Sequence, residues 1–86
     1  MTVYLVDEPS IEIAMSYASG DSSARIFLLQ DAVYAAVRGE VEGEVYVLKE
    51  DLLRRGLGSK VPPRVRAVGY ADLVHLMEEE KVVNLL

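Results

Sequence analysis

Short apolar runs alternate with segments of helical periodicity along this chain of 86 residues. Runs rich in β-branched and aromatic residues predict strands over residues 2–6, 24–29, 44–48 and 65–68. The second run is apolar without a break from Ile26 to Leu29, which is typical of a strand covered on both faces of a parallel sheet. The last residues, 81–86, are apolar as well and predict either a fifth strand or a segment that contacts another subunit.

Between these runs, apolar residues recur at helical spacing. The spacing predicts helices over residues 9–20, 32–38, 49–55 and 71–80. Pro9 fits the first turn of the first helix, and Gly20 and Gly56 are stop signals for the first and third. Asp31 is placed to cap the second helix. In the fourth helix, Leu73, Leu76 and Met77 are expected to face the interior.

Strands that alternate with helices indicate an α/β fold with a parallel sheet and helices on its faces. We expect one domain over residues 1–86, with four or five strands and short flanking helices in three layers. The second helix is apolar on nearly every side, from Ala32 to Val37, which predicts burial against more than one neighbour.

Composition narrows the possible functions. Hydrophobic residues make up 51% of the chain, more than the thin core of so small a domain needs, so an oligomer is expected. No apolar run is long enough to cross a membrane and no signal peptide is recognisable, which predicts a cytoplasmic protein. Nine basic residues against fourteen acidic ones, a net charge of −5, argue against nucleic-acid binding. The single basic cluster, Lys60, Arg64 and Arg66, is interpreted as a solvated face.

Cysteine is absent, which excludes disulfides, thiolate metal sites and a persulfide carried on this chain. Asn84 and Gln30 are the single asparagine and the single glutamine. Scarcity of thermolabile residues is a feature of heat-adapted, thermophile proteins, although chance explains such small numbers equally well.

Polar residues follow three predicted strands, as Asp7-Glu8, Gln30-Asp31 and Lys49-Glu50-Asp51. Functional groups of a parallel sheet gather at the carboxyl ends of its strands. These carboxylates either bind a hard cation such as Mg²⁺ or, as the favoured interpretation, each caps the helix that follows its strand. No metal site and no cofactor are predicted.

Residues with catalytic potential lack a motif around them. His75 shares a polar helix face with Asp72 and Glu79, but a surface imidazole is favoured over a general base, because no nucleophile motif or phosphate-binding loop accompanies it. Five tyrosines are spread over the elements, and Tyr34, amid apolar neighbours, suits either an interface anchor or the core. The chain is therefore not expected to be an enzyme.

Two segments resemble the TusB/DsrH family, the smallest member of the DsrE/DsrF/DsrH group. Residues 28–33 read Leu-Leu-Gln-Asp-Ala-Val, followed by Ala35-Ala36, and are similar to the family's Leu-Leu-Gln-Asp-Gly-Val with a later Ala-Ala. Residues 45–52 read Val-Tyr-Val-Leu-Lys-Glu-Asp-Leu, followed by Arg55-Gly56-Leu57, and are similar to Val-Tyr-Ala-Leu-x-Glu-Asp-Leu with Arg-Gly-Leu. Weaker matches are Pro9 and residues 69–74.

The resemblance implies a flavodoxin-like fold and a place in a cytoplasmic complex with TusC/DsrF-like and TusD/DsrE-like subunits. Such complexes pass sulfur as a persulfide toward tRNA wobble uridine thiolation, or serve dissimilatory sulfur metabolism. The cysteine of the DsrE/TusD paralogue follows the third strand, and the comparable place here, Leu48-Lys49, has no thiol.

Two hypotheses follow. The first is a non-catalytic subunit of a sulfur relay, and the second is a stand-alone homo-oligomer that binds a small ligand or cation at its acidic strand ends. The residues expected to contact a partner are at the polar strand ends, on the helix that follows the third strand, and at the apolar second helix: Gln30, Asp31, Tyr34, Lys49, Glu50, Asp51, Arg54 and Arg55.

Overall fold

A computed structural model describes residues 2–86 and shows a five-stranded, wholly parallel sheet. The strands lie in the order β4-β3-β2-β1-β5. Their bounds are β1 Thr2–Val6, β2 Ala24–Leu28, β3 Val45–Leu48, β4 Arg66–Val68 and β5 Lys81–Leu85. The α/β prediction is thus confirmed, and the apolar end of the chain is a strand.

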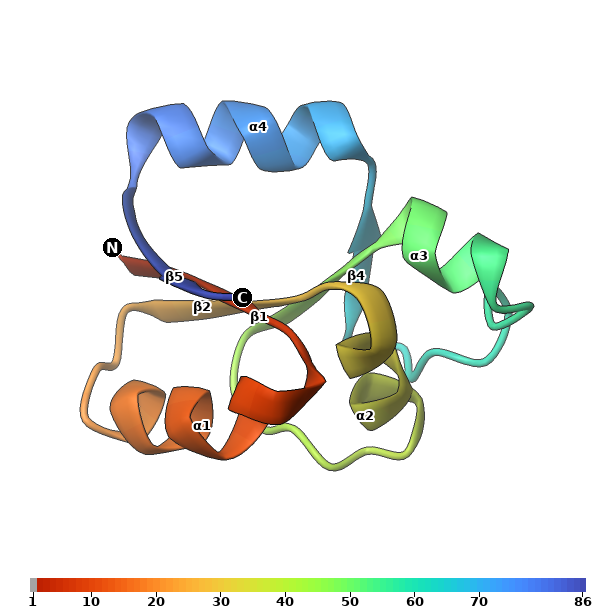
Figure 1. The fold of residues 1–86 in the computed structure, drawn as a ribbon, viewed down its shortest axis with the longest axis horizontal. Coiled ribbons are helices and arrows are strands. Elements are labelled where there is room, and N and C mark those ends of the chain that lie inside the picture. The colour runs from red at the N-terminus through yellow and green to blue at the C-terminus, as the bar shows by residue number, and fades with distance from the viewer. Residues whose placement is uncertain (1) are drawn as a thin grey trace.

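Helices cover both faces of this sheet (Figure 1). Helices α1 and α2 lie on one face, and α4 lies alone on the other. The bounds of the helices are α1 Ile11–Ser19, α2 Val33–Val37, α3 Lys49–Arg54 and α4 Tyr70–Glu79, with single 3₁₀ turns η1 Glu8–Ser10 and η2 Gln30–Ala32. The chain moves outward from β1 to β4 and then returns over α4 to the far side of β1. Because such crossovers are right-handed, the return places α4 on the opposite face.

Two apolar clusters form the core, one on each face of the sheet. The cluster beneath α1 and α2 is the larger and includes Val6, Leu28 and Val47, each with no exposed surface. Leu52 joins it from α3. The cluster under α4 is smaller and is built on Phe27 stacked on Tyr46, with ring centroids 5.1 Å apart. The single helix α4 therefore covers its face only in part.

Several predicted details are corrected by the structure. Asp31 does not cap the second helix, because its side chain makes no capping hydrogen bond and the chain first forms the turn η2. Met77 does not face the interior, since 38% of it is exposed, whereas Leu73 is buried. Tyr34 is 37% exposed, so it does not belong to the core, but its neighbours Val33, Ala35 and Ala36 are buried as the all-round apolar pattern predicted.

Other local signals are confirmed. Asp7 caps the 3₁₀ turn that contains Pro9, accepting a hydrogen bond from the Glu8 N–H. Gly56 has a φ of +67°, and the turn after α3 closes around it; a left-handed residue at that position favours glycine. No helix among residues 2–86 has the length and apolar character needed to cross a bilayer.

Candidate functional site

The carboxyl ends of β2 and β3 open into a cleft of about 510 Å³ that also contacts the start of α4. Its apolar wall comes from strand ends and α4, and its polar wall comes from η2 and α3. The lining residues are Leu29, Gln30, Leu48, Glu50, Asp51, Arg54, Arg55, Tyr70 and Leu73. Five of the eight residues predicted from the sequence thus meet at one place: Gln30, Glu50, Asp51, Arg54 and Arg55.

Asp51 is the centre of the polar wall. It is the one charged residue that is buried among residues 2–86, with 4% of its surface exposed. Its Oδ2 accepts a hydrogen bond of 2.7 Å from the backbone N–H of Gln30. A carboxylate so deeply buried is stable only when hydrogen bonds or opposite charges compensate for its lost hydration.

The register of the sheet explains why the carboxylate is needed there. The N–H of Ile26 donates to the carbonyl of Glu44, the residue just before β3, and alternate residues of β2 point the same way. The N–H of Gln30 continues this series, but β3 ends at Leu48 and α3 begins at the next residue. The side chain of Asp51 therefore supplies the acceptor that the ladder no longer provides.

Gln30 adopts an unusual backbone conformation at this point. Its φ is +52°, the one positive value for a non-glycine residue among residues 2–86. Left-handed backbone costs free energy for a residue with a side chain, and it persists where the surroundings hold it in place. The bond to Asp51 holds Gln30 in this turn while its side chain stays exposed at the mouth of the cleft.

Arg55 connects the two acidic residues. Its Nε and Nη2 lie 3.1 and 3.0 Å from Asp31 Oδ1, and its Nη1 donates to the main-chain carbonyl of Asp51 at 3.1 Å. Nη1 also lies 3.7 Å from Asp51 Oδ1. Arg54 Nη1 approaches the same oxygen at 3.5 Å, yet 73% of the Arg54 side chain is exposed. Asp31 and Asp51 are therefore neutralised by arginine, and Arg54 keeps most of its donors available.

The cleft includes Tyr70, a residue that the sequence analysis missed. Tyr70, at the first turn of α4, is 62% exposed, and its N–H donates to Glu50 Oε2 at 3.2 Å. Leu53 on α3, outside the lining of the cleft, is 60% exposed. Tyr70 comes two residues after the end of β4, so the rule that selected the other strand ends would have selected it as well.

Some predicted residues stay outside this cleft. Lys49 and Tyr34 are exposed but line no part of it, and Asp7 and Glu8 stand at the end of β1 away from its lining. His75 is also distant from it and pairs instead with Glu79, at 3.2 Å on the surface of α4. The strand-end carboxylates therefore do not converge on one point, and only Asp7 caps the helical turn that follows its own strand. Asp51 and Glu50 instead accept from the first N–H groups of η2 and α4.

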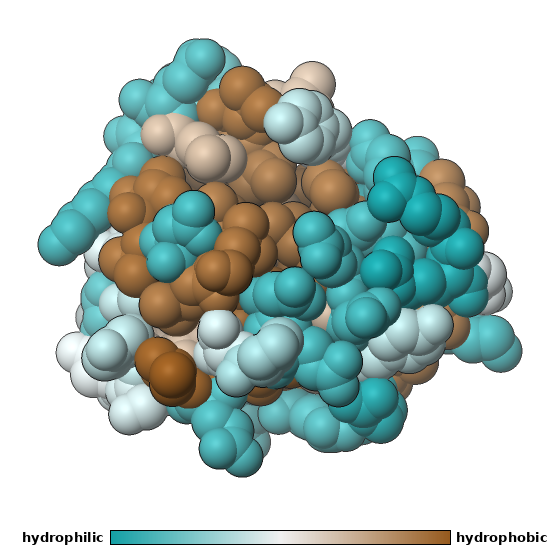
Figure 2. Space-filling model, viewed as in Figure 1, coloured by the Kyte–Doolittle hydropathy of each residue, from teal (hydrophilic) through white to brown (hydrophobic). Residues whose placement is uncertain are grey.

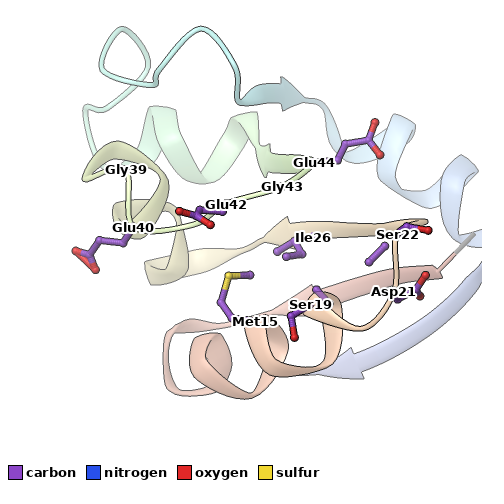
Figure 3. A pocket seen from close by; sticks show the side chains of 12 residues that line it. Met15, Ser19, Asp21, Ser22, Ile26, Gly39, Glu40, Glu42, Gly43 and Glu44 are labelled. Atoms are coloured by element: carbon purple, nitrogen blue, oxygen red, sulfur yellow. The ribbon is translucent and has the colours of Figure 1, made fainter.

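A larger cavity, of about 620 Å³, lies at the opposite ends of the strands (Figure 3). Met15 and Ile26 face its interior, whereas the carboxylates of Glu40 and Glu44 point away from it. Glu40 pairs with Arg38, and Glu44 pairs with Arg25 at 3.1 Å. Hydrogen bonds from Ser23 lower the pKa of Asp21 at its edge. Asp21, Glu40 and Glu44 are thus already bound by neighbouring side chains, so the smaller cleft is the better candidate.

The cleft is suited to recognition. Its exposed arginine and tyrosine side chains, Arg54 and Tyr70, are of the types that anchor protein interfaces. Among residues 2–86, no group of three or more histidine, aspartate or glutamate side chains has the arrangement of a metal site.

Replacing Asp51 is expected to destabilise the protein. Asp51→Ala leaves the Gln30 N–H without its acceptor and removes the charge beside Arg55, which should lower the free energy of unfolding by about 2–3 kcal/mol. The matched control is Asp31→Ala, whose carboxylate is 60% exposed and should contribute less than about 1 kcal/mol. Urea denaturation of both variants measures the difference. Equal losses of unfolding free energy in the two variants would show that the burial of Asp51 does not determine its contribution to stability.

Magnesium should bind weakly or not at all at these strand ends, because arginine already neutralises Asp31 and Asp51. We expect millimolar Mg²⁺ to change the melting temperature by less than about 1 °C. Thermal melts with and without the metal test this. A saturable rise that disappears in Asp31→Asn would instead support a cation site.

Comparisons with known proteins agree with this architecture. The DsrH-like protein family matches residues 7–83. Protein TusB from Erwinia tasmaniensis is 43% identical over 67 residues, which cover 69% of this chain and 67% of that protein. Protein TusB from Salmonella enteritidis is 39% identical over 59 residues, and the match spans 59% of this chain and 62%, less than two thirds, of that relative.

A solved structure gives the same fold. The crystal structure of the ychN protein from E. coli superposes with a TM-score of 0.73 at 22% sequence identity, covering 98% of this chain and 97% of that one. At this identity the likeness establishes the fold, and the family match over residues 7–83 establishes the relationship. With the same parallel sheet and the predicted sequence segments in place, the chain belongs to the DsrH-like family.

Proposed function

We propose that this chain is a non-catalytic, cysteine-free subunit of a sulfur-relay complex, and that its cleft receives a cysteine-bearing subunit of the same family. The relatives carry the name TusB, which links them to that relay by the resemblance described above. The observation that supports the proposal most is the position of Leu48, which lines the cleft. By resemblance, Leu48-Lys49 is where the paralogue carries its cysteine.

The absence of a thiol there assigns the sulfur chemistry to the partner. A persulfide requires a cysteine thiolate, and this chain contains no cysteine. What the chain contributes is therefore a shaped surface: a fixed turn at Gln30, the available donors of Arg54, and the exposed side chain of Tyr70. Such a surface can place a partner's loop and shield it from water.

The partners expected for this role are TusC/DsrF-like and TusD/DsrE-like subunits in the cytoplasm. Arg54 and Arg55 stand at the contact, so an acidic partner surface is favoured over a basic one. Arg55 is committed to Asp31 and Asp51, which leaves Arg54 as the principal donor. Whether the sulfur proceeds to tRNA wobble uridine or to dissimilatory metabolism depends on the partner.

A second candidate function is supported by the size of the cleft. A volume of about 510 Å³ is within the range of small-molecule sites, so a stand-alone homo-oligomer could hold a small ligand there. The two candidate functions differ in which molecule occupies the cleft. A cysteine-bearing paralogue binds in the first case, and a small molecule binds without any paralogue in the second.

Omitting this subunit should reduce the amount of sulfur that is transferred to the cysteines of its partner subunits. When labelled sulfur from a cysteine desulfurase is supplied to the cognate paralogues with and without this chain, label should appear only on partner cysteines, and more of it when the chain is present. Arg54→Glu should weaken partner binding about 10-fold or more. Arg38→Glu is the matched control, since Arg38 also lies beside one carboxylate and is about half exposed.

Three results would contradict the proposal. The first is that no cysteine-bearing paralogue binds the chain. The second is that labelling of the partners is the same without it. The third is that Arg38→Glu reduces binding as much as Arg54→Glu does.

A further inference from the structure

The two edges of the sheet differ in how they are protected. β4 has three residues, starts with Arg66 and follows the prolines Pro62 and Pro63. Short length, charge and proline are the devices that keep an edge strand from pairing with another chain. β5 has five residues and lacks proline, and no charge follows Lys81 along it. Its outer side faces no strand among residues 2–86.

Exposed apolar residues of α4 lie beside this open edge. Asp72, His75 and Leu76 line a groove with Tyr46 and Val68, so that flank of the helix faces β3 and β4. At helical spacing, Val74 and Met77 occupy the opposite flank, toward β5. They are 37% and 38% exposed.

Helix α1, on the other face of the sheet, also has one flank toward the middle strands and an exposed apolar flank toward β5. Met15 and Ser19 line the cavity beside β2 and β3, which places Ile13 and Tyr17 on the flank toward β5. Both are more than half exposed. Tyr17 stacks on Tyr4 of β1, with ring centroids 6.5 Å apart.

The open strand and both flanks thus form one surface, which we call the β5 seam. Five of the eight large hydrophobic residues that are exposed among residues 2–86 belong to it: Ile13, Tyr17, Val74, Met77 and Leu86. Figure 2 shows hydrophobic side chains gathered between α4 and α1 over this edge. A contiguous patch of this kind on a small domain indicates a protein interface.

We propose that the β5 seam joins two copies of this chain, with the two β5 strands paired antiparallel about a two-fold axis perpendicular to the sheet. This interface is separate from the cleft and goes beyond the proposed function. The two-fold axis keeps like faces together. It brings Val74 and Met77 of α4 toward their counterparts, and Ile13 and Tyr17 of α1 toward theirs, so one isologous contact covers both apolar flanks.

Charge at the ends of the seam fits the same arrangement. Lys81 begins β5, whereas Asp7 and Glu8 follow Val6 of β1, which pairs with Leu85 at the other end of β5. Antiparallel pairing brings the beginning of one β5 strand to the end of the other. The lysine of each copy therefore meets the acidic end of its partner, and the apolar residues 82–83 and 85–86 lie between these charges.

A second copy fits this surface better than an extended peptide does. A single added strand would satisfy the backbone of β5 but would leave the flanks on α1 and α4 exposed. A domain with its own α1 and α4 beside its own β5 covers all three parts at once.

The absence of cysteine allows a direct test. A two-fold antiparallel pair places one residue opposite itself, with Cα atoms about 4.5–5.5 Å apart, within reach of a disulfide. Single cysteines at Val82, Val83, Asn84 and Leu85 should therefore cross-link two chains with a maximum at one position after oxidation. Lys60→Cys, on an exposed loop away from the seam, should cross-link at least about 10-fold less.

Light scattering at micromolar concentration supplies the second readout. The purified chain should be a dimer, and Met77→Glu should weaken association by about 100-fold or more, because it places two carboxylates across the axis. Tyr34→Glu is the matched control, since Tyr34 is 37% exposed on α2, and it should remain dimeric. Circular dichroism verifies that each variant is folded.

Three outcomes overturn the proposal: a monomeric chain, a dimer lost in Tyr34→Glu but kept in Met77→Glu, or cross-linking at Lys60→Cys equal to that in β5. If the chain alone is monomeric and a different protein binds β5, the proposal that a second copy of the chain occupies the β5 seam is also rejected. Each test uses the chain alone, so failure here leaves the proposed binding of a cysteine-bearing subunit to be judged separately.

Discussion

The hydrogen bond from the Gln30 N–H to the buried carboxylate of Asp51 is the contact on which the carboxyl edge of this molecule depends. It ends the ladder between β2 and β3 at the point where β3 becomes α3 without a connecting loop. A charged acceptor forms a stronger hydrogen bond than a neutral carbonyl does, which helps hold Gln30 in a left-handed turn. Arg55 then joins the same carboxylate to Asp31. These contacts tie η2 and α3 together at the polar wall of the cleft.

The architecture was predictable because the strands are apolar and the crossovers obey general rules. The unbroken run Ile26 to Leu29 indicated a strand with two covered faces, and helices do lie on both sides of it. Parallel strands direct their carboxyl ends to one edge, so most of the cleft residues followed from polar residues placed after strands. The DsrH-like segments at residues 28–33 and 45–52 coincide with the strand ends that form the cleft.

Other features were hidden because they depend on partners distant in sequence. Asp31 had the pattern of a helix cap, but its carboxylate accepts a hydrogen bond from Arg55, 24 residues away in the sequence. Asp51 also looked like a cap for its own helix, yet it is buried and accepts a hydrogen bond from the N–H of Gln30, the first residue of the turn η2 after β2. Met77 fits the inner stripe of α4 by periodicity, but the sheet under that helix is too narrow on the β5 side to cover it. Periodicity gives the direction of a side chain and cannot show where the neighbouring element ends.

The most direct measurement for the central claim is hydrogen–deuterium exchange of this chain with and without its cysteine-bearing paralogue. If the cleft is the docking surface, the paralogue should slow exchange at residues 29–32, 49–55 and 70–73, and should leave β5 at the rate it has in the chain alone. Asp51→Ala should weaken that protection. Unchanged exchange around Gln30 and α3 in a saturated complex, or protection confined to β5, would contradict the account.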